Sequence, residues 1–332
     1  MSTTSQTIGQ LQLDGLVQGV HGIYSTKDAK RSLWDVWMHT NHHAAAVGEE
    51  VRKGSAGQLL VELADCAMWL FTMVKKLQGP IGIPKPPNDS QQESLIRIAN
   101  SYSEILWNKF PGVCPFCYWR RTEGDRKKEQ QYGFRRPCDC LSHDAARRDE
   151  SQKRAHASCL RAFSQENAAD RPAGVDDWQE MFRTIFAANL RHLTLSDIAF
   201  HLLEEMGEAS DAMIRMYTYK DTNFVPGEPL WRQIRLEEEL ADVSSWVFAL
   251  VEKLDSAQHR AAERIEWLRH TEKSLGERML LSQVIWQRYG SDDLRTFACW
   301  KCKKPSCSCE IVLVPPDRSV DELSGLIESA QS

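Results

Sequence analysis

Apolar residues recur at every third or fourth position over much of this chain, which is the spacing of one face of an α-helix. The clearest stripe lies in residues 194–220 and consists of Ile198, Leu202, Met206, Ala209 and Met213. Ser196 and Asp197 precede this stripe as N-cap candidates. Further helices are predicted over 33–52, 58–77, 91–109, 231–254 and 257–289. Because strand signal is scarce, with Ile311–Val314 as the best short candidate, the pattern predicts an all-α fold.

Breaks in the helical pattern divide the chain into parts. The stretch QGPIGIPKPPNDS (78–90) is too rich in proline and glycine for a helix or a strand, and we expect a linker there. A loop with two prolines and a glycine separates the helices at 194–220 and 231–254. The expected organisation is a helical half at 1–77, a linker, helix and first cysteine cluster at 78–172, a second helical half at 173–290, and a second cysteine cluster with a C-terminal tail at 291–332.

The two helical halves resemble each other in sequence. VELADCAMWLFTMVKKL (61–77) and EELADVSSWVFALVEKL (238–254) are identical at nine of 17 positions, at a constant spacing of 177 residues. Upstream, HHAAAVGEE (42–50) aligns with HLLEEMGEA (201–209), and a cysteine cluster follows each half. The same landmarks in the same order indicate an internal tandem duplication.

Composition narrows the class of protein. With 332 residues, a formal net charge of −5, 26% charged and 42% apolar residues, the chain is typical of soluble globular proteins. Mild acidity excludes a globally basic nucleic-acid binder. No apolar run approaches the roughly 18 residues of a membrane span, and the N-terminus lacks a secretory signal, so we expect a cytoplasmic protein without a membrane partner. Cysteines in that reducing compartment rarely form disulfides.

Eight of the ten cysteines fall into two clusters with metal-ligand spacing. The first cluster consists of Cys114, Cys117, Cys138 and Cys140, and the second of Cys299, Cys302, Cys307 and Cys309. Four thiolates suit tetrahedral Zn²⁺ and leave no open coordination position, which predicts two structural zinc-knuckle modules. Iron–sulfur clusters are an alternative, and His143 is an alternative ligand in the first cluster.

A second group of candidate ligands is acidic. Glu204, Glu205 and Glu208 lie on one helical turn, and Glu239 and Asp242 form an i, i+3 pair on the next long helix. Two antiparallel helices can bring these like charges together, and a divalent cation removes the repulsion that results. Oxygen ligands in this number suit Mg²⁺ or Mn²⁺. A solvated acidic face is the plain alternative, but the residues flanking Asp242 are apolar, which indicates a buried seam.

The segments EEMGE (204–208) and ELAD (239–242) resemble the EExxE…ExxD signature of MazG-like nucleotide pyrophosphohydrolases, an all-α superfamily. The resemblance implies a helical bundle that uses Mg²⁺ to hydrolyse nucleoside triphosphates to monophosphate and pyrophosphate. By motif position, Glu205, Glu208, Glu239 and Asp242 would hold Mg²⁺, and Glu204 would support them or orient water. The likeness covers 185–255 well and 35–77 more weakly. The 30-residue gap between the two motif parts is longer than is usual for the family.

The first half departs from this signature. It contains Glu49, Glu62 and Asp65, but Ala45 and Ala46 stand at the positions that the sequence alignment gives to Glu204 and Glu205. Two acids are therefore missing, which leaves a poor Mg²⁺ site. MazG-like domains usually dimerise to form their bundle, so we expect the first half to act as an internal pseudo-dimer partner.

The predicted function is that of a Mg²⁺-dependent nucleoside triphosphate pyrophosphohydrolase. The rival hypothesis is a non-catalytic nucleotide sensor or scaffold whose zinc modules bind a partner or nucleic acid. Residues 118–155 are rich in Lys and Arg, which suits phosphate contacts, although a solvated excursion is the favoured interpretation. Assembly into a homo-oligomer is left open by the sequence.

Overall fold

The computed structural model describes residues 12–78, 100–115, 118, 150–217, 228–255, 279–291 and 296–309. Within these residues the chain is mostly helical and forms no β-strand, which confirms the all-α prediction. The strand candidate Ile311–Val314, the linker at 78–90 (apart from Gln78) and the loop at 218–227 lie outside the described residues.

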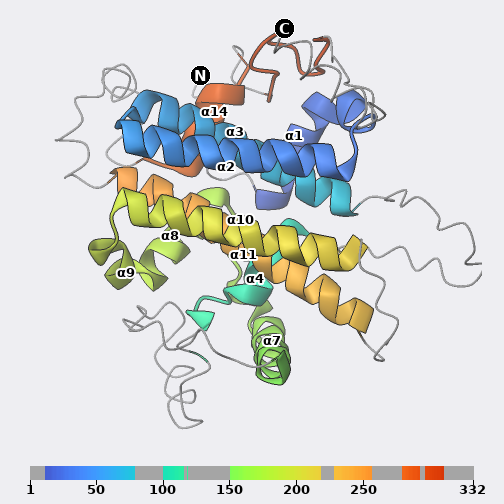
Figure 1. The fold of residues 1–332 in the computed structure, drawn as a ribbon, viewed down its shortest axis with the longest axis vertical. Coiled ribbons are helices and arrows are strands. Elements are labelled where there is room, and N and C mark those ends of the chain that lie inside the picture. The colour runs from blue at the N-terminus through green and yellow to red at the C-terminus, as the bar shows by residue number, and fades with distance from the viewer. Residues whose placement is uncertain are drawn as a thin grey trace, which may run out of the picture.

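Four long helices form the centre of the molecule: α2 (Leu33–Lys53), α3 (Ala56–Gln78), α10 (Leu195–Tyr217) and α11 (Glu228–Asp255). They are accompanied by α1 (Leu13–Asp28), α4 (Tyr102–Lys109), α7 (Glu150–Glu166), α8 (Val175–Ile185), α9 (Ala187–His192), α14 (Leu281–Tyr289) and a short 3₁₀ turn, η3 (Ala168–Asp170). Figure 1 shows two layers, with α1, α2 and α3 in one and α8, α10 and α11 in the other. Apolar residues of both layers form one continuous core.

The long helices occur where the apolar periodicity predicts them, whereas their ends and the shorter helices differ. Helix α10 is capped by Thr194, whose hydroxyl accepts from the backbone N–H of Asp197, so neither Ser196 nor Asp197 is the N-cap. Helix α14 begins only at Leu281, because Met279 and Leu280 are not helical, and the prediction of one helix over 257–289 is wrong at that point. The sequence analysis missed α1, α7, α8 and α9.

Helices of the two layers match at a constant spacing of 162 residues. Ser32 with Asp35 and Thr194 with Asp197 form the same reciprocal capping pair at the start of α2 and α10. The buried apolar or small residues of α2 recur in α10 at this spacing, as Leu33/Leu195, Val36/Ile198, Ala44/Met206 and Val47/Ala209. The N-cap residues of α1 and α8, Gln12 and Gly174, have the same spacing and pair with each other in an isolated bridge.

This spacing corrects the sequence alignment by three residues. HHAAAVGEE and HLLEEMGEA are 159 residues apart, but α2 and α10 superpose in burial and capping at 162. At the structural spacing, the residues at the positions of Glu204, Glu205 and Glu208 are His42, His43 and Ala46. The first half therefore has none of the three acids of α10, and Glu49 is not the counterpart of Glu208.

The short helices α4 and α14 each pack against the layer formed by the other half of the sequence. Helix α4 follows α3 in sequence but contacts α11, and α14 follows α11 but contacts α3 (Figure 1). Both are tied to their own half by a serine that donates to an aspartate: Ser103 to Asp14 and Ser282 to Asp176. The halves are thus interlocked.

Helix α3 lies in the core of this arrangement. Gly57–Gln78 is long and apolar enough to cross a membrane by length and composition alone, but 72% of its apolar window is buried inside the protein. That burial is typical of the central helix of a soluble bundle.

Candidate functional site

Three of the predicted carboxylates meet where α10 packs against α11. Glu205 and Glu208 on α10 and Glu239 on α11 each offer an oxygen within 4.8 Å of the others. The two helices run antiparallel, since Arg232 near the start of α11 donates to the carbonyl of Arg215 near the end of α10. The i, i+3 spacing on α10 then aims two carboxylates at the same turn of α11. Three oxygen ligands in one place fit a hard divalent cation.

Glu204 lies outside this group. Its side chain is about half exposed, and its carboxylate contacts Nδ1 of His201 at 3.0 Å. The His201 ring in turn stacks on Trp246 of α11, with 4.7 Å between ring centroids. Glu204 is therefore available at the solvent edge of the site.

Asp242 lies one turn beyond Glu239 on α11 and has a cation of its own. Its Oδ2 is 2.8 Å from Nζ of Lys109, the last residue of α4, and both side chains are largely buried. Burial alone would lower the pKa of Lys109, but the charges of Asp242, Glu238 and Glu239 outweigh it and raise the pKa above its usual value. Lys109 is thus a fixed positive charge at the edge of the acidic group.

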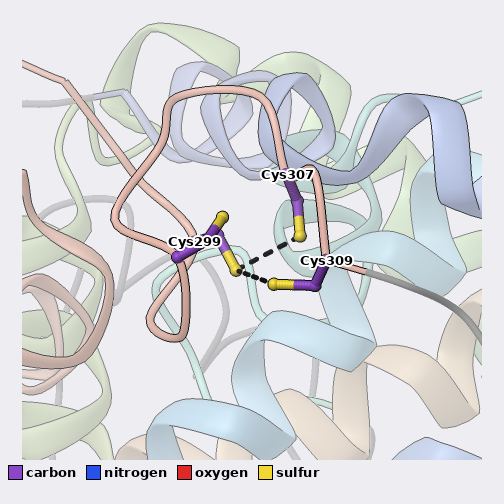
Figure 2. Close-up of side chains that lie close together, drawn as sticks. Cys299, Cys307 and Cys309 are labelled. Carbon is purple, nitrogen blue, oxygen red and sulfur yellow. Dashed lines mark hydrogen bonds between the residues drawn. The ribbon is translucent and has the colours of Figure 1, made fainter.

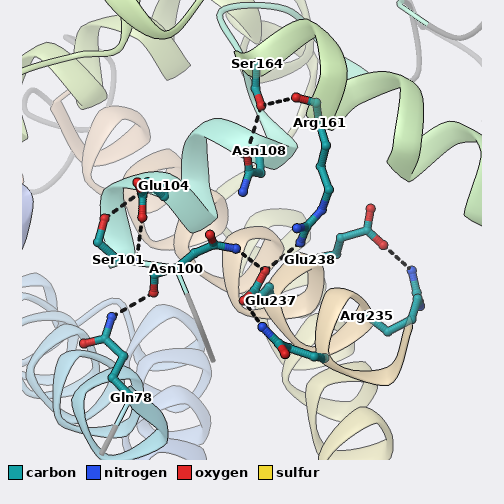
Figure 3. A network of polar contacts seen from close by, with 11 residues as sticks. Gln78, Asn100, Ser101, Glu104, Asn108, Arg161, Ser164, Arg235, Glu237 and Glu238 are labelled. Atoms are coloured by element: carbon teal, nitrogen blue, oxygen red, sulfur yellow. Dashed lines mark hydrogen bonds and ion pairs between the residues drawn. The ribbon is translucent and has the colours of Figure 1, made fainter. Parts of the chain in front are cut away.

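A second cation, Arg235, lies on the other side of the group. Its guanidinium bonds to Glu238 at 3.1 Å and to Glu239, both on its own helix (Figure 3). These contacts keep the buried Glu239 oriented in the metal-free protein.

Glu237 points away from the acidic group into a separate polar network (Figure 3). It accepts from Arg161 of α7 at 2.6 Å and from Asn100 at 2.8 Å, and it is almost completely buried. Asn108 accepts from Ser164, and Gln78 donates to the carbonyl of Asn100. The network fixes α4 and α7 against α11, which places Lys109 beside Asp242.

Burial and mutual repulsion hold protons in the acidic group. Desolvation, with the charges of Asp242 and Glu239, raises the pKa of Glu205 to about 9. Desolvation and Asp242 likewise raise the pKa of Glu239 to about 7, although Arg235 and Lys109 act in the opposite direction. Without a cation, the site therefore does not carry its full negative charge at neutral pH.

The corresponding place in the first half is neutralised by its own residues. His43, at the position of Glu205, contacts Glu62, at the position of Glu239, with 2.8 Å between Nδ1 and Oε2. Asp65, at the position of Asp242, accepts from both Nε and Nη2 of Arg288 at 3.0 and 2.9 Å, and from the hydroxyl of Tyr289. Among the described residues, this place holds no group of three metal-ligand side chains.

The second cysteine cluster is assembled as predicted. The Sγ atoms of Cys299, Cys302, Cys307 and Cys309 all lie within 4.8 Å of one another, so they could hold a metal ion such as zinc. Figure 2 shows Cys307 and Cys309 approaching Cys299, with Sγ–Sγ distances of 3.3 and 4.0 Å. No disulfide joins the four.

The backbone of the cluster has the tight turn that a metal knuckle needs. Lys303 has a φ of +56°, and its N–H donates to the carbonyl of Cys299 at 2.8 Å. Backbone N–H groups of Ser308 and Lys304 donate to the Cys302 sulfur and lower the pKa of this thiol to about 6. At least one sulfur is thus prepared as a thiolate, the form that binds metal.

The cluster is anchored on α1. The N–H of Cys307 donates to the carbonyl of Ile23 at 2.8 Å. The Phe297 ring lies so close to Gly19 that a Cβ there would be 2.7 Å from it. Trp300 also stacks under the guanidinium of Arg288, at 4.1 Å, which joins the cluster to the Asp65 contact.

Only Cys114 of the first cluster is described, and it is buried in the main core. Cys117, Cys138 and Cys140, together with His143, lie outside the described residues, so the first zinc module stays a prediction.

The sequence analysis missed the cations of the acidic site. Lys109 and Arg235 carried no motif, although Arg235 lies i, i+4 from Glu239 and this spacing is a detectable signal. The earlier candidate Arg215 instead pairs with Asp211 on the surface at 2.6 Å. Comparison of the chain with protein-family models, with curated proteins and with solved structures finds no match.

Proposed function

We propose that this protein is a Mg²⁺-dependent nucleoside triphosphate pyrophosphohydrolase that releases pyrophosphate and a nucleoside monophosphate. The observation that supports this proposal is the meeting of Glu205, Glu208 and Glu239 at the seam of α10 and α11. Mn²⁺ is an equivalent cofactor, because it also prefers oxygen ligands.

Each residue of the site has a role in this proposal. Glu205, Glu208 and Glu239, with the free oxygen of Asp242, hold the cation, which when bound neutralises phosphate charge and lowers the pKa of water. Glu204, at the exposed edge, orients the water. Lys109 and Arg235 supply positive charge toward the triphosphate.

The proposal includes an internal pseudo-dimer of MazG-like halves. The matching capping pairs, the burial pattern at a spacing of 162 residues and the exchange of α4 and α14 support such a duplication. In this view only the second half keeps the acidic site, and each half is followed by a structural zinc module.

The test is an assay of purified protein with a panel of nucleoside triphosphates and Mg²⁺, in which pyrophosphate is measured. We expect release from at least one nucleotide, and loss of at least 100-fold in rate in a Glu205→Gln/Asp242→Asn variant, because the cation loses two charged ligands. Glu49→Gln, at an exposed glutamate of the first half, is the matched control and keeps full activity. No cleavage of any nucleotide, or full activity in the double variant, contradicts the proposal.

A second candidate function is binding of nucleic acid or a protein partner through the zinc knuckle. It is favoured by Trp300, which is 43% exposed beside the exposed Lys301 and Lys303. Aromatic platforms flanked by cations suit unpaired bases. Salt-dependent binding of single-stranded oligonucleotides that is lost in Trp300→Ala would support this function over turnover.

A further inference from the structure

The aspartate on the second long helix has a cation partner in both halves of the chain, and the two partners come from equivalent helices. Asp242 is held by Lys109 at the end of α4, and Asp65 by Arg288 at the end of α14. In each case the cation comes from the helix that crosses over from the other half.

The contact in the first half shows that this arrangement does not depend on an empty acidic site. A lysine beside several unneutralised carboxylates could approach one of them simply because no metal is present. Asp65 has no such carboxylate group around it, since His43 and Ala46 replace two of the acids, yet its cation is present and bidentate. The fold therefore provides a positive charge at this aspartate in both places.

The two contacts differ in how much of the aspartate they use. Arg288 and Tyr289 occupy both oxygens of Asp65. Lys109 contacts only Oδ2 of Asp242, as a point charge, and leaves Oδ1 to face the other carboxylates. The group of three close carboxylates lies beside this ion pair and does not include Asp242.

We infer that Lys109 takes the place of a second cation, so that the acidic site binds one divalent ion per chain. A second divalent ion would need Asp242 as a bridging ligand, and the ammonium group of Lys109 occupies that position. This inference rests on the metal site of the proposed function and adds its stoichiometry, which the sequence did not determine.

The experiment is a Mn²⁺ titration of the zinc-loaded full chain, in which free Mn²⁺ is followed by electron paramagnetic resonance. We expect one tight Mn²⁺ in the wild type. In Lys109→Met, Asp242 is released and a positive charge is removed, so we expect two. In Lys109→Met/Asp242→Asn the second ion is lost again, which assigns it to Asp242.

Two further variants control for charge and folding. Lys109→Arg retains the positive charge and is expected to bind one ion. Lys253→Met removes a lysine three turns further along α11, whose Nζ donates to the carbonyl of Leu190, and is also expected to bind one ion. Circular dichroism establishes that each variant is folded, and Lys109→Gln replaces Lys109→Met if the latter does not fold.

Two or no tight ions in the wild type, or one ion in folded Lys109→Met, would overturn the inference. The nucleotide assay separates it from the proposed function. If the ion counts follow the expectation but no nucleotide is cleaved, only the enzymatic proposal fails. If nucleotide is cleaved while Lys109→Met still binds one ion, only the stoichiometry fails.

Discussion

At the scale of single residues, the same position has opposite roles in the two halves. Asp242 lies beside a group of carboxylates that retains protons, whereas Asp65 is fully engaged by Arg288 and Tyr289. The first position is electrostatically unfavourable in the absence of a ligand, and the second stabilises the fold. This difference leads to two predictions.

The stability of the metal-free protein falls as pH rises. The pKa of Glu205 is raised to about 9 and that of Glu239 to about 7, from 4.5 in an unperturbed glutamate. The native state therefore binds more protons than the unfolded state between pH 4.5 and 9, and the free energy of unfolding decreases across this window. Urea unfolding at pH 5, 7 and 9 in magnesium-free buffer measures the slope.

Glu205→Gln removes the larger of these two contributions, so this variant is expected to be more stable than the wild type at pH 9 and to lose less stability from pH 7 to 9. Mg²⁺ is expected to flatten the wild-type profile in the same way, since a cation favours the ionised carboxylates. A wild-type stability that increases from pH 7 to 9 is incompatible with these shifted pKa values.

Asp65 contributes to stability rather than to metal binding. Asp65→Ala leaves the guanidinium of Arg288 and the Tyr289 hydroxyl without their acceptor, which costs about 3 kcal/mol of unfolding free energy. Urea denaturation measures the change, and Asp211→Ala, in an exposed ion pair with Arg215, is the matched control with little effect. A change as small as the control would show that the Asp65 contact is dispensable.

At the scale of helices, local capping determines where the central elements begin. The reciprocal pairs Ser32–Asp35 and Thr194–Asp197 satisfy backbone N–H groups at the starts of α2 and α10, and thereby fix which turn of α10 carries the carboxylates. A shift of one residue would rotate Glu205 and Glu208 away from α11 by about 100°.

Thr194→Ala is expected to destabilise the protein by about 1 kcal/mol, because the first turn of α10 loses its side-chain cap. Ser196→Ala, two residues later and exposed, is the control and should change little. Thermal or urea unfolding distinguishes the two variants. An equal or larger effect of Ser196→Ala would place the cap where the sequence pattern suggested.

At the scale of the whole molecule, the helices that cross between the halves connect the two kinds of site. Helix α14 carries Arg288 to Asp65 and continues into the cysteine cluster, whose Cys307 is bonded to α1. A metal in this cluster would therefore fasten the C-terminal part of the chain to the first layer.

Cys307→Ser is expected to lower the zinc content from two ions per chain to one and to lower the melting temperature. The physical reason is that the Cys299–Cys309 cluster binds N but not U, so that its metal stabilises the fold. Zinc is quantified by elemental analysis of protein purified without chelator, and Cys159→Ser, outside both clusters, is the control. Unchanged zinc content in Cys307→Ser would remove the cluster as a metal site.

The sequence by itself determined the helical class, the four long helices, the meeting of Glu205, Glu208 and Glu239, and the cluster of Cys299, Cys302, Cys307 and Cys309. These follow from periodicity and short spacings, which are local properties of the chain. Only the tertiary structure decided the register between α2 and α10 and the partners Lys109 and Arg288. Those contacts join residues more than 130 positions apart, and long-range packing of α4 and α14, rather than any local preference, brings them together.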